Sequence, residues 1–301
     1  TPEVWDEDMR LMKQANCNAM SVGIFSWSQL EPEEGRFTFE WLDTIMDKLA
    51  KNSAYAVLAT PSAAHPAWMS ARYPEVLRVN RERQRHRHGG RVAYCLTSPV
   101  YREKSRLMAR KLAERYKGHP ALLVWHVHNE YGGDCHCELC QAAFRDWLRA
   151  KYGTIDTLNA AWWTGFWGHA YTEWEQIESG DWVVHGLQMD WKRFVTDQTV
   201  ACFRNEADVL REVTPGVPVT TNTYWFFVDY DWRKWAPVLD VISEDAYPMY
   251  HDRPDNWRTG VSVSFGHDFY RGMKGGQPFL LMESTPSSTN WAPVMKLKRP
   301  G

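Results

Sequence analysis

Two glutamates follow short apolar runs and are the strongest candidates for chemistry. Glu130 comes after the run at 122–127, and Glu283 comes directly after the run at 279–282. A carboxyl group at the end of a buried strand is partly desolvated, which tunes its pKa. Glycoside hydrolysis needs two carboxyls, one to protonate the leaving oxygen and one to attack the anomeric carbon or activate water. Either glutamate alone would indicate a salt bridge or a helix cap, but the pair predicts a glycosidase site.

Other carboxylates compete with this pair. Glu244 and Asp245 follow the apolar run at 239–242 and are the rivals of Glu283. Glu31 lies past the run at 19–25, where we expect a loop salt bridge rather than a third catalytic acid.

The neighbours of Glu130 are also polar. Asn129 carries an amide that can hold a sugar hydroxyl, and the turn residues 131–133 follow the glutamate. His126 and His128 share strand parity with Glu130, so all three side chains are expected on one face. For the histidines we expect packed or hydrogen-bonded roles, with His128 within reach of substrate.

Three cysteines, Cys135, Cys137 and Cys140, have the spacing C-x-C-x2-C. Thiolates this close commonly bind zinc, which prefers four tetrahedral ligands. The fourth ligand would be Cys95, before the helix at 102–116, or His136, whose position between two ligands disfavours it. A site closed by four protein ligands would be structural, and the alternative is a set of free thiols.

Short apolar strands alternate with helices around these residues, which indicates a parallel sheet covered by helices. Because no glycine-rich phosphate loop follows any strand, we expect an α/β fold of the (β/α)8 TIM-barrel type rather than a doubly wound sheet. Helices are predicted over 5–15, 41–49, 102–116, 142–152 and 191–213, and strands over 19–25, 55–60, 122–127, 217–221, 239–242 and 279–282.

Composition narrows the class of protein. The 301 residues include 17 tryptophans, which is high for a core alone and suits stacking on sugar rings. The net charge of −2 does not indicate a basic surface for binding nucleic acid or a membrane. Six cysteines are too few for a disulfide scaffold, and reduced thiols predict a cytoplasmic protein. Cys17 and Cys202 are expected to be core thiols.

Three separated motifs resemble glycoside hydrolase family 42, a family of β-galactosidases. They are WHVHNEYG at 125–132, FSWSQLEPEEG at 25–35, and Met282-Glu283 followed by Asn290-Trp291. The resemblance implies that Glu130 is the acid/base and Glu283 the nucleophile of a retaining enzyme. It also implies a structural Zn²⁺ site in which Cys95 is the fourth ligand. Sugar-contacting or supporting roles are implied for Arg91, Asn129, Tyr247, Trp291 and Trp167.

The same resemblance sets expectations for the whole molecule. The substrate would be a β-galactoside or galacto-oligosaccharide, and the full-length form a homotrimer. Clan geometry leaves β-glucosidase, β-mannanase or arabinosidase activity as alternatives, and a non-catalytic sugar-binding barrel as another.

The ends of the chain also carry an expectation. The chain opens with a helix and stops shortly after the strand at 279–282, so residues 1–301 are expected to form one partial catalytic barrel domain with strands two to seven of eight. We expect such an open sheet to be poorly soluble and nearly inactive by itself.

Overall fold

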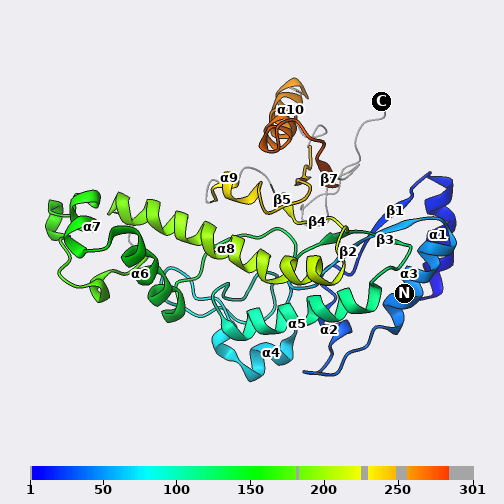
Figure 1. Ribbon diagram of the computed structural model, residues 1–301, viewed down its shortest axis with the longest axis horizontal. Helices are drawn as coiled ribbons and strands as arrows, with labels where there is room; N and C mark the ends of the chain where they lie inside the picture. The colour runs from blue at the N-terminus through cyan, green and yellow to red at the C-terminus, as the bar shows by residue number, and fades with distance from the viewer. Residues whose placement is uncertain (1, 181–182, 225–229, 249–255, 285–301) are drawn as a thin grey trace.

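Parallel strands and helices alternate in the computed structural model, which describes residues 2–180, 183–224, 230–248 and 256–284 (Figure 1). One set of parallel strands has the order β1-β2-β3-β4, and a second has the order β5-β6-β7. Their bounds are β1 Ala19–Val22, β2 Tyr55–Ala59, β3 Leu122–His126, β4 Val219–Thr220, β5 Asn222–Tyr224, β6 Ser243–Asp245 and β7 Leu280–Glu283.

The two sets join through a single interrupted strand. Only Thr221 separates β4, which pairs with β3, from β5, which pairs with β6. The described strands therefore follow chain order across six positions, and β1 and β7 each pair with one neighbour. This is the open, incomplete barrel predicted from the sequence.

Helices follow most of the strands and cover the sheet. Their starts obey local rules: the Ser98 hydroxyl accepts the amide of Tyr101 ahead of Pro99, and Thr154 caps α7 in the same way. The bounds are η1 Pro2–Val4, α1 Trp5–Gln14, α2 Trp27–Leu30, α3 Glu40–Lys51, α4 Ala67–Arg72, η2 Pro74–Val76, α5 Pro99–Tyr116, α6 Glu138–Tyr152, α7 Ile155–Trp162, η3 Phe166–Gly168, η4 Trp174–Gln176, α8 His185–Val213, α9 Trp232–Trp235 and α10 Asn256–Met273.

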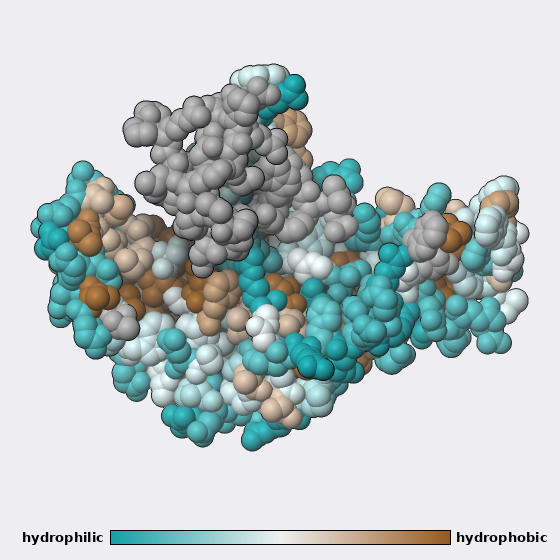
Figure 2. All heavy atoms as spheres, turned by 180° about the vertical axis from the view of Figure 1, so that it is seen from behind, coloured by the Kyte–Doolittle hydropathy of each residue, from teal (hydrophilic) through white to brown (hydrophobic). Residues whose placement is uncertain are grey.

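The main core lies between the sheet and two long helices. α5 and α8 run side by side (Figure 1) and bury Leu112 and Phe203 in the same cluster as Trp125 of β3. A second cluster lies between α6, α7 and the start of α8, and it contains the four cysteines near Glu130. The surface seen in Figure 2 is largely hydrophilic along its lower margin, with hydrophobic side chains across the middle of that face.

Two predictions about these elements are wrong. No strand forms at 239–242, where Asp240 instead bonds to Val219 through its backbone and side chain; the strand β6 begins at Ser243. Glu244 and Asp245 are therefore inside β6 rather than after it. Cys17, expected in the core, is exposed, because it follows the C-terminal end of α1 in a turn. Cys202 is buried as expected.

No helix among the described residues is long and apolar enough to cross a membrane.

Candidate active site and cysteine cluster

Glu130 is held by a tight turn just beyond β3. Both His128 and Glu130 have left-handed backbone conformations, with φ of 64° and 45°. Such conformations are strained for non-glycine residues and persist only when the surroundings fix them. The Thr60 hydroxyl accepts the His128 amide at 2.9 Å, and Asn222 Oδ1 accepts the Glu130 amide at 2.9 Å. The turn thus directs a buried carboxyl toward β5 and the strands beyond it.

Glu283 is the last residue of β7 and points to the same place. Its Oε1 accepts from Asn222 Nδ2 at 3.0 Å, and its Oε2 accepts from the Tyr247 hydroxyl. Carboxylate oxygens of Glu130, Asp245 and Glu283 lie within 4.8 Å of one another. This short separation suits a retaining pair, whose carboxyls lie about 5 Å apart, and not an inverting pair, which leaves room for a water between them.

Arg91 brings the nearest positive charge. Its guanidinium pairs with Glu130 Oε2 and lies 5.9 Å from the centre of the Phe25 ring. Asn129 is buried beside the pair and accepts from Asn222 Nδ2 at 3.0 Å. Arg91, Asn129 and Tyr247, predicted from the sequence, therefore all meet Glu130 or Glu283, directly or through Asn222.

Asn222 is a candidate site residue that the sequence analysis missed. Its Nδ2 lies within hydrogen-bonding distance of Asn129, Asp245 and Glu283, while its Oδ1 faces the Glu130 amide and His126 Nε2. The only sequence signal was an asparagine in a strand region, where this residue type is depleted.

Burial and mutual repulsion shift the pKa values of the acidic groups. Burial raises the pKa of Asp245 to about 9, and the charges of Glu283 and Glu130 add to this rise. Burial also raises the pKa of Glu283, and the hydrogen bond from Tyr247 opposes that rise. Like charges this close cannot all be ionised, so at least one proton is shared in the cluster.

One predicted aromatic contact, that of Trp167, is not found at this site. Trp167 is 74% exposed, contacts Phe166, and lines a hollow of about 410 Å³ near α7, whereas β7 lies elsewhere in the fold (Figure 1). The structure does not bring it to Glu130 or Glu283 within this chain. Trp291 lies outside the described residues.

The other polar residues considered have separate partners. Glu244 points to the opposite side of β6 from Asp245, where its Oε2 lies 3.6 Å from His267 Nε2 of α10. Glu31 has no salt bridge with any described residue, contrary to expectation. It is buried and accepts the Trp27 indole N–H and the Gly35 amide, both at 2.8 Å, because it closes the turn after α2. His126 and His128 are buried, with Asn222 and Tyr94 as their partners.

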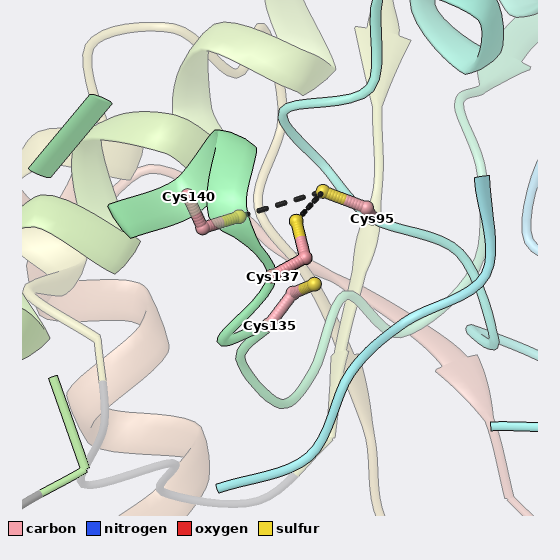
Figure 3. Close-up of side chains that lie close together, drawn as sticks. All are labelled: Cys95, Cys135, Cys137 and Cys140. Carbon is pink, nitrogen blue, oxygen red and sulfur yellow. Dashed lines mark hydrogen bonds between the residues drawn. The ribbon is translucent and has the colours of Figure 1, made fainter. Parts of the chain in front are cut away.

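The four predicted cysteines converge in a second, buried cluster (Figure 3). Cys95 Sγ lies 3.5 Å from Cys137 Sγ and 3.4 Å from Cys140 Sγ, and all four sulfurs lie within 4.8 Å of one another. Tetrahedral zinc with bonds of about 2.3 Å would separate its sulfurs by roughly 3.8 Å. The donor set and spacing therefore fit one metal ion with four thiolate ligands.

His136, the rival fourth ligand, is excluded by its own contacts. Its Nδ1 faces the Ser179 hydroxyl at 2.7 Å and its Nε2 faces Asp134 at 3.0 Å. The ring stacks on Trp191, with centroids 4.8 Å apart. Both ring nitrogens are thus engaged away from the sulfurs, and Cys95 is the fourth member.

Comparison with known proteins agrees with this geometry. A family model described as β-galactosidase, of glycoside hydrolase family 42, matches residues 1–301. The chain is 55% identical to β-galactosidase BglY of Alicyclobacillus acidocaldarius over 304 aligned residues, covering 100% of this chain and 44% of BglY. It is 52% identical to β-galactosidase Pbg of Clostridium perfringens, covering 100% of this chain and 45% of Pbg.

A solved structure is similarly close. The crystal structure of the β-galactosidase from Rahnella sp. R3 superposes with a TM-score of 0.97 at 54% identity, covering 99% of this chain and 45% of that one. The chain thus spans somewhat less than half the length of the relatives that it matches.

Proposed function

The chain belongs to glycoside hydrolase family 42, the β-galactosidases, and from this premise we propose that the whole protein hydrolyses terminal β-D-galactosides with retention. The observation that carries the proposal is the meeting of Glu130, just beyond β3, with Glu283 of β7, with carboxylate oxygens within 4.8 Å. Residues 1–301 would form part of one catalytic barrel domain, acting on β-galactosides or galacto-oligosaccharides.

The first step would transfer the galactosyl group to the protein. A Glu283 oxygen attacks the anomeric carbon and forms an ester bond, while the bond from that carbon to the leaving oxygen breaks. Glu130 gives its proton to the leaving oxygen. Tyr247 orients the attacking carboxylate through its hydroxyl, and Asn222 holds the other Glu283 oxygen.

The second step would release galactose. Glu130, now a carboxylate, takes a proton from water as that water attacks the anomeric carbon and the Glu283 ester bond breaks. The ion pair with Arg91 stabilises the charge that Glu130 carries between the two steps. We also propose Arg91 and Asn129 as partners of sugar hydroxyls, and Trp291 as an aromatic wall.

Turnover of a nitrophenyl β-galactoside by the full-length protein tests this function. Glu283→Gln should abolish turnover, and Glu130→Ala should be partly rescued by azide with formation of a β-galactosyl azide. An α-azide product would overturn the two roles. Preference for a glucoside, mannan or arabinoside would place the enzyme elsewhere in the clan, and binding without turnover would indicate a sugar-binding barrel.

We propose that the cysteine cluster holds a structural Zn²⁺. Four thiolates leave no open position for substrate, and the ion would fix the loop that leads from Glu130 to α6. The metal would be lost in an oxidising compartment if the thiols formed disulfides, so a cytoplasmic location suits the six free cysteines.

We further propose a homotrimer for the whole protein. Trp163, Phe166 and Trp167 are 78%, 61% and 74% exposed, an unusual concentration of aromatic surface for a monomer. Light scattering of the full-length protein at several concentrations tests this assembly.

A further inference from the structure

Asp245 is a third carboxyl group in the active site for which the double displacement has no use. It is 1% exposed, and its oxygens belong to the same cluster as those of Glu130 and Glu283. β6 alternates its side chains, so Asp245 faces the pair while Glu244 faces His267.

The charges around Asp245 do not balance if all three carboxyls are ionised. The groups that face it are Glu130 beyond β3, Glu283 of β7, Tyr247 beyond β6 and Tyr270 of α10. Among the described residues, the cluster's ion pair is the one between Arg91 and Glu130. Three negative charges, two of them buried and one half-buried, against one half-exposed cation would be strongly unfavourable, so the cluster must hold protons.

Hydrogen bonding indicates which oxygen of Asp245 carries its proton. Asn222 Nδ2 donates to Oδ2 at 2.7 Å, so Oδ2 acts as the acceptor. Carboxylate oxygens of Asp245 and Glu130 lie within 4.8 Å of each other. The remaining oxygen, Oδ1, is buried and has no hydrogen-bond partner among the described residues, so it is the position from which a proton could be donated to Glu130.

We propose that Asp245 is a positioning residue that keeps its proton throughout the reaction and donates a hydrogen bond to Glu130. This inference rests on the proposed function. In the resting enzyme, Glu283 is the charged nucleophile, Glu130 holds the proton that it gives to the leaving oxygen, and Asp245 keeps its own proton. In the galactosyl-enzyme, Glu283 is an ester and Glu130 is ionised, and Asp245 then stabilises the Glu130 carboxylate together with Arg91.

The pH profile of kcat/KM for a galactoside with a poor leaving group tests the proposal in the full-length protein. Asp245→Asn keeps a neutral donor of the same shape, so activity should stay within about tenfold and the basic limb within about half a pH unit. If Asp245 is ionised in the resting enzyme, the amide removes a negative charge beside Glu130. The basic limb would then move to lower pH by about one unit or more, which overturns the proposal.

A second variant separates positioning from simple packing. Asp245→Ala removes the donor, so the basic limb should move to higher pH. Release of galactose from a dinitrophenyl galactoside, the step in which Glu130 is an anion, should slow by about tenfold or more. Restoration of both properties in Asp245→Asn is expected, and equal damage in both variants would contradict the donor role.

An infrared measurement on the wild-type protein tests the proposal even if the Asp245 variants fold poorly. In the wild-type protein trapped with a 2-fluorogalactosyl group, ¹³C-labelled aspartate should give a shifted carboxylic-acid band in the infrared, and its absence would overturn the proposal. Trapping also separates a failure of the proposed function from a failure of the proposed role of Asp245. Failure to label Glu283 would contradict the proposed function, whereas normal labelling without the band would contradict the role of Asp245 alone.

Discussion

Asn222 Nδ2 lies 3.0 Å from Glu283 Oε1, although the two residues are 61 positions apart in the chain. The opposite end of the same amide, Oδ1, accepts the backbone N–H of Glu130 at 2.9 Å. One side chain therefore contacts both members of the proposed catalytic pair.

Asn222→Ala should lower kcat by about a hundredfold, because it removes hydrogen bonds to a carboxylate and to the strained turn at Glu130. KM should change little if the amide acts on the pair rather than on the sugar. Steady-state kinetics on the full-length protein measure both constants. Asn52→Ala, at the exposed end of α3, is the matched control and should behave as wild type. An Asn222→Ala enzyme with normal kcat would show that the pair is positioned by other contacts.

Tyr247→Phe should move the acid limb of kcat/KM to higher pH. The tyrosine hydroxyl lowers the pKa of Glu283, against the larger effect of burial, by stabilising the carboxylate. Its removal raises that pKa, so the nucleophile becomes protonated at a pH where the wild type is still active. A shift of about one unit corresponds to one charge-assisted hydrogen bond. Tyr55→Phe, on an exposed residue of β2, is the control. An unchanged acid limb would separate Tyr247 from the nucleophile.

Cys137→Ser should release the metal from the cysteine cluster and lower thermal stability. One zinc per chain is expected in the wild type and well under one in the variant, with a loss of about 2 kcal/mol or more. Metal analysis and thermal unfolding measure the two effects. Cys17→Ser is the control, because Cys17 is exposed and outside the cluster. Stoichiometric zinc in Cys137→Ser would contradict the four-thiolate site.

Glu206→Gln should stabilise the protein at pH 8 and not at pH 4. Burial raises the pKa of Glu206 from the ordinary value of 4.5 to about 7, although the hydroxyls of Thr60 and Ser62 oppose the rise. Between these values the unfolded chain loses its proton first, so the wild type loses stability as pH rises from about 4.5 to about 7.

The glutamine does not titrate, so the gain at pH 8 should approach about 3 kcal/mol. Urea unfolding at the two pH values measures the difference. Glu75→Gln, at an exposed position of η2, should change stability little at either pH. An equal effect of Glu206→Gln at pH 4 and pH 8 would mean that the carboxyl does not titrate between them.

The sequence by itself determined the elements and the strongest chemical candidates. Strand and helix alternation, the apolar runs before Glu130 and Glu283, and the spacing of Cys135, Cys137 and Cys140 are local patterns, and each forms as predicted. Local patterns are reliable because the period of side-chain burial along a strand or helix depends on neighbouring residues. The apolar run at 239–242 gave a wrong strand prediction. Leu239 and Ile242 are buried, but they lie just before β6 and not in it.

Only the tertiary structure decided which of these residues meet. Asn222 contacts the Glu130 turn across 92 positions of sequence, and Asp245 reaches the same carboxyls from a neighbouring strand. Trp167 is aromatic, as sugar-binding residues often are, but it lies near α7 and not beside Glu130 and Glu283. The physical reason is that strand pairing aligns the carboxyl ends of distant segments, and no local pattern records which polar side chains then face one another.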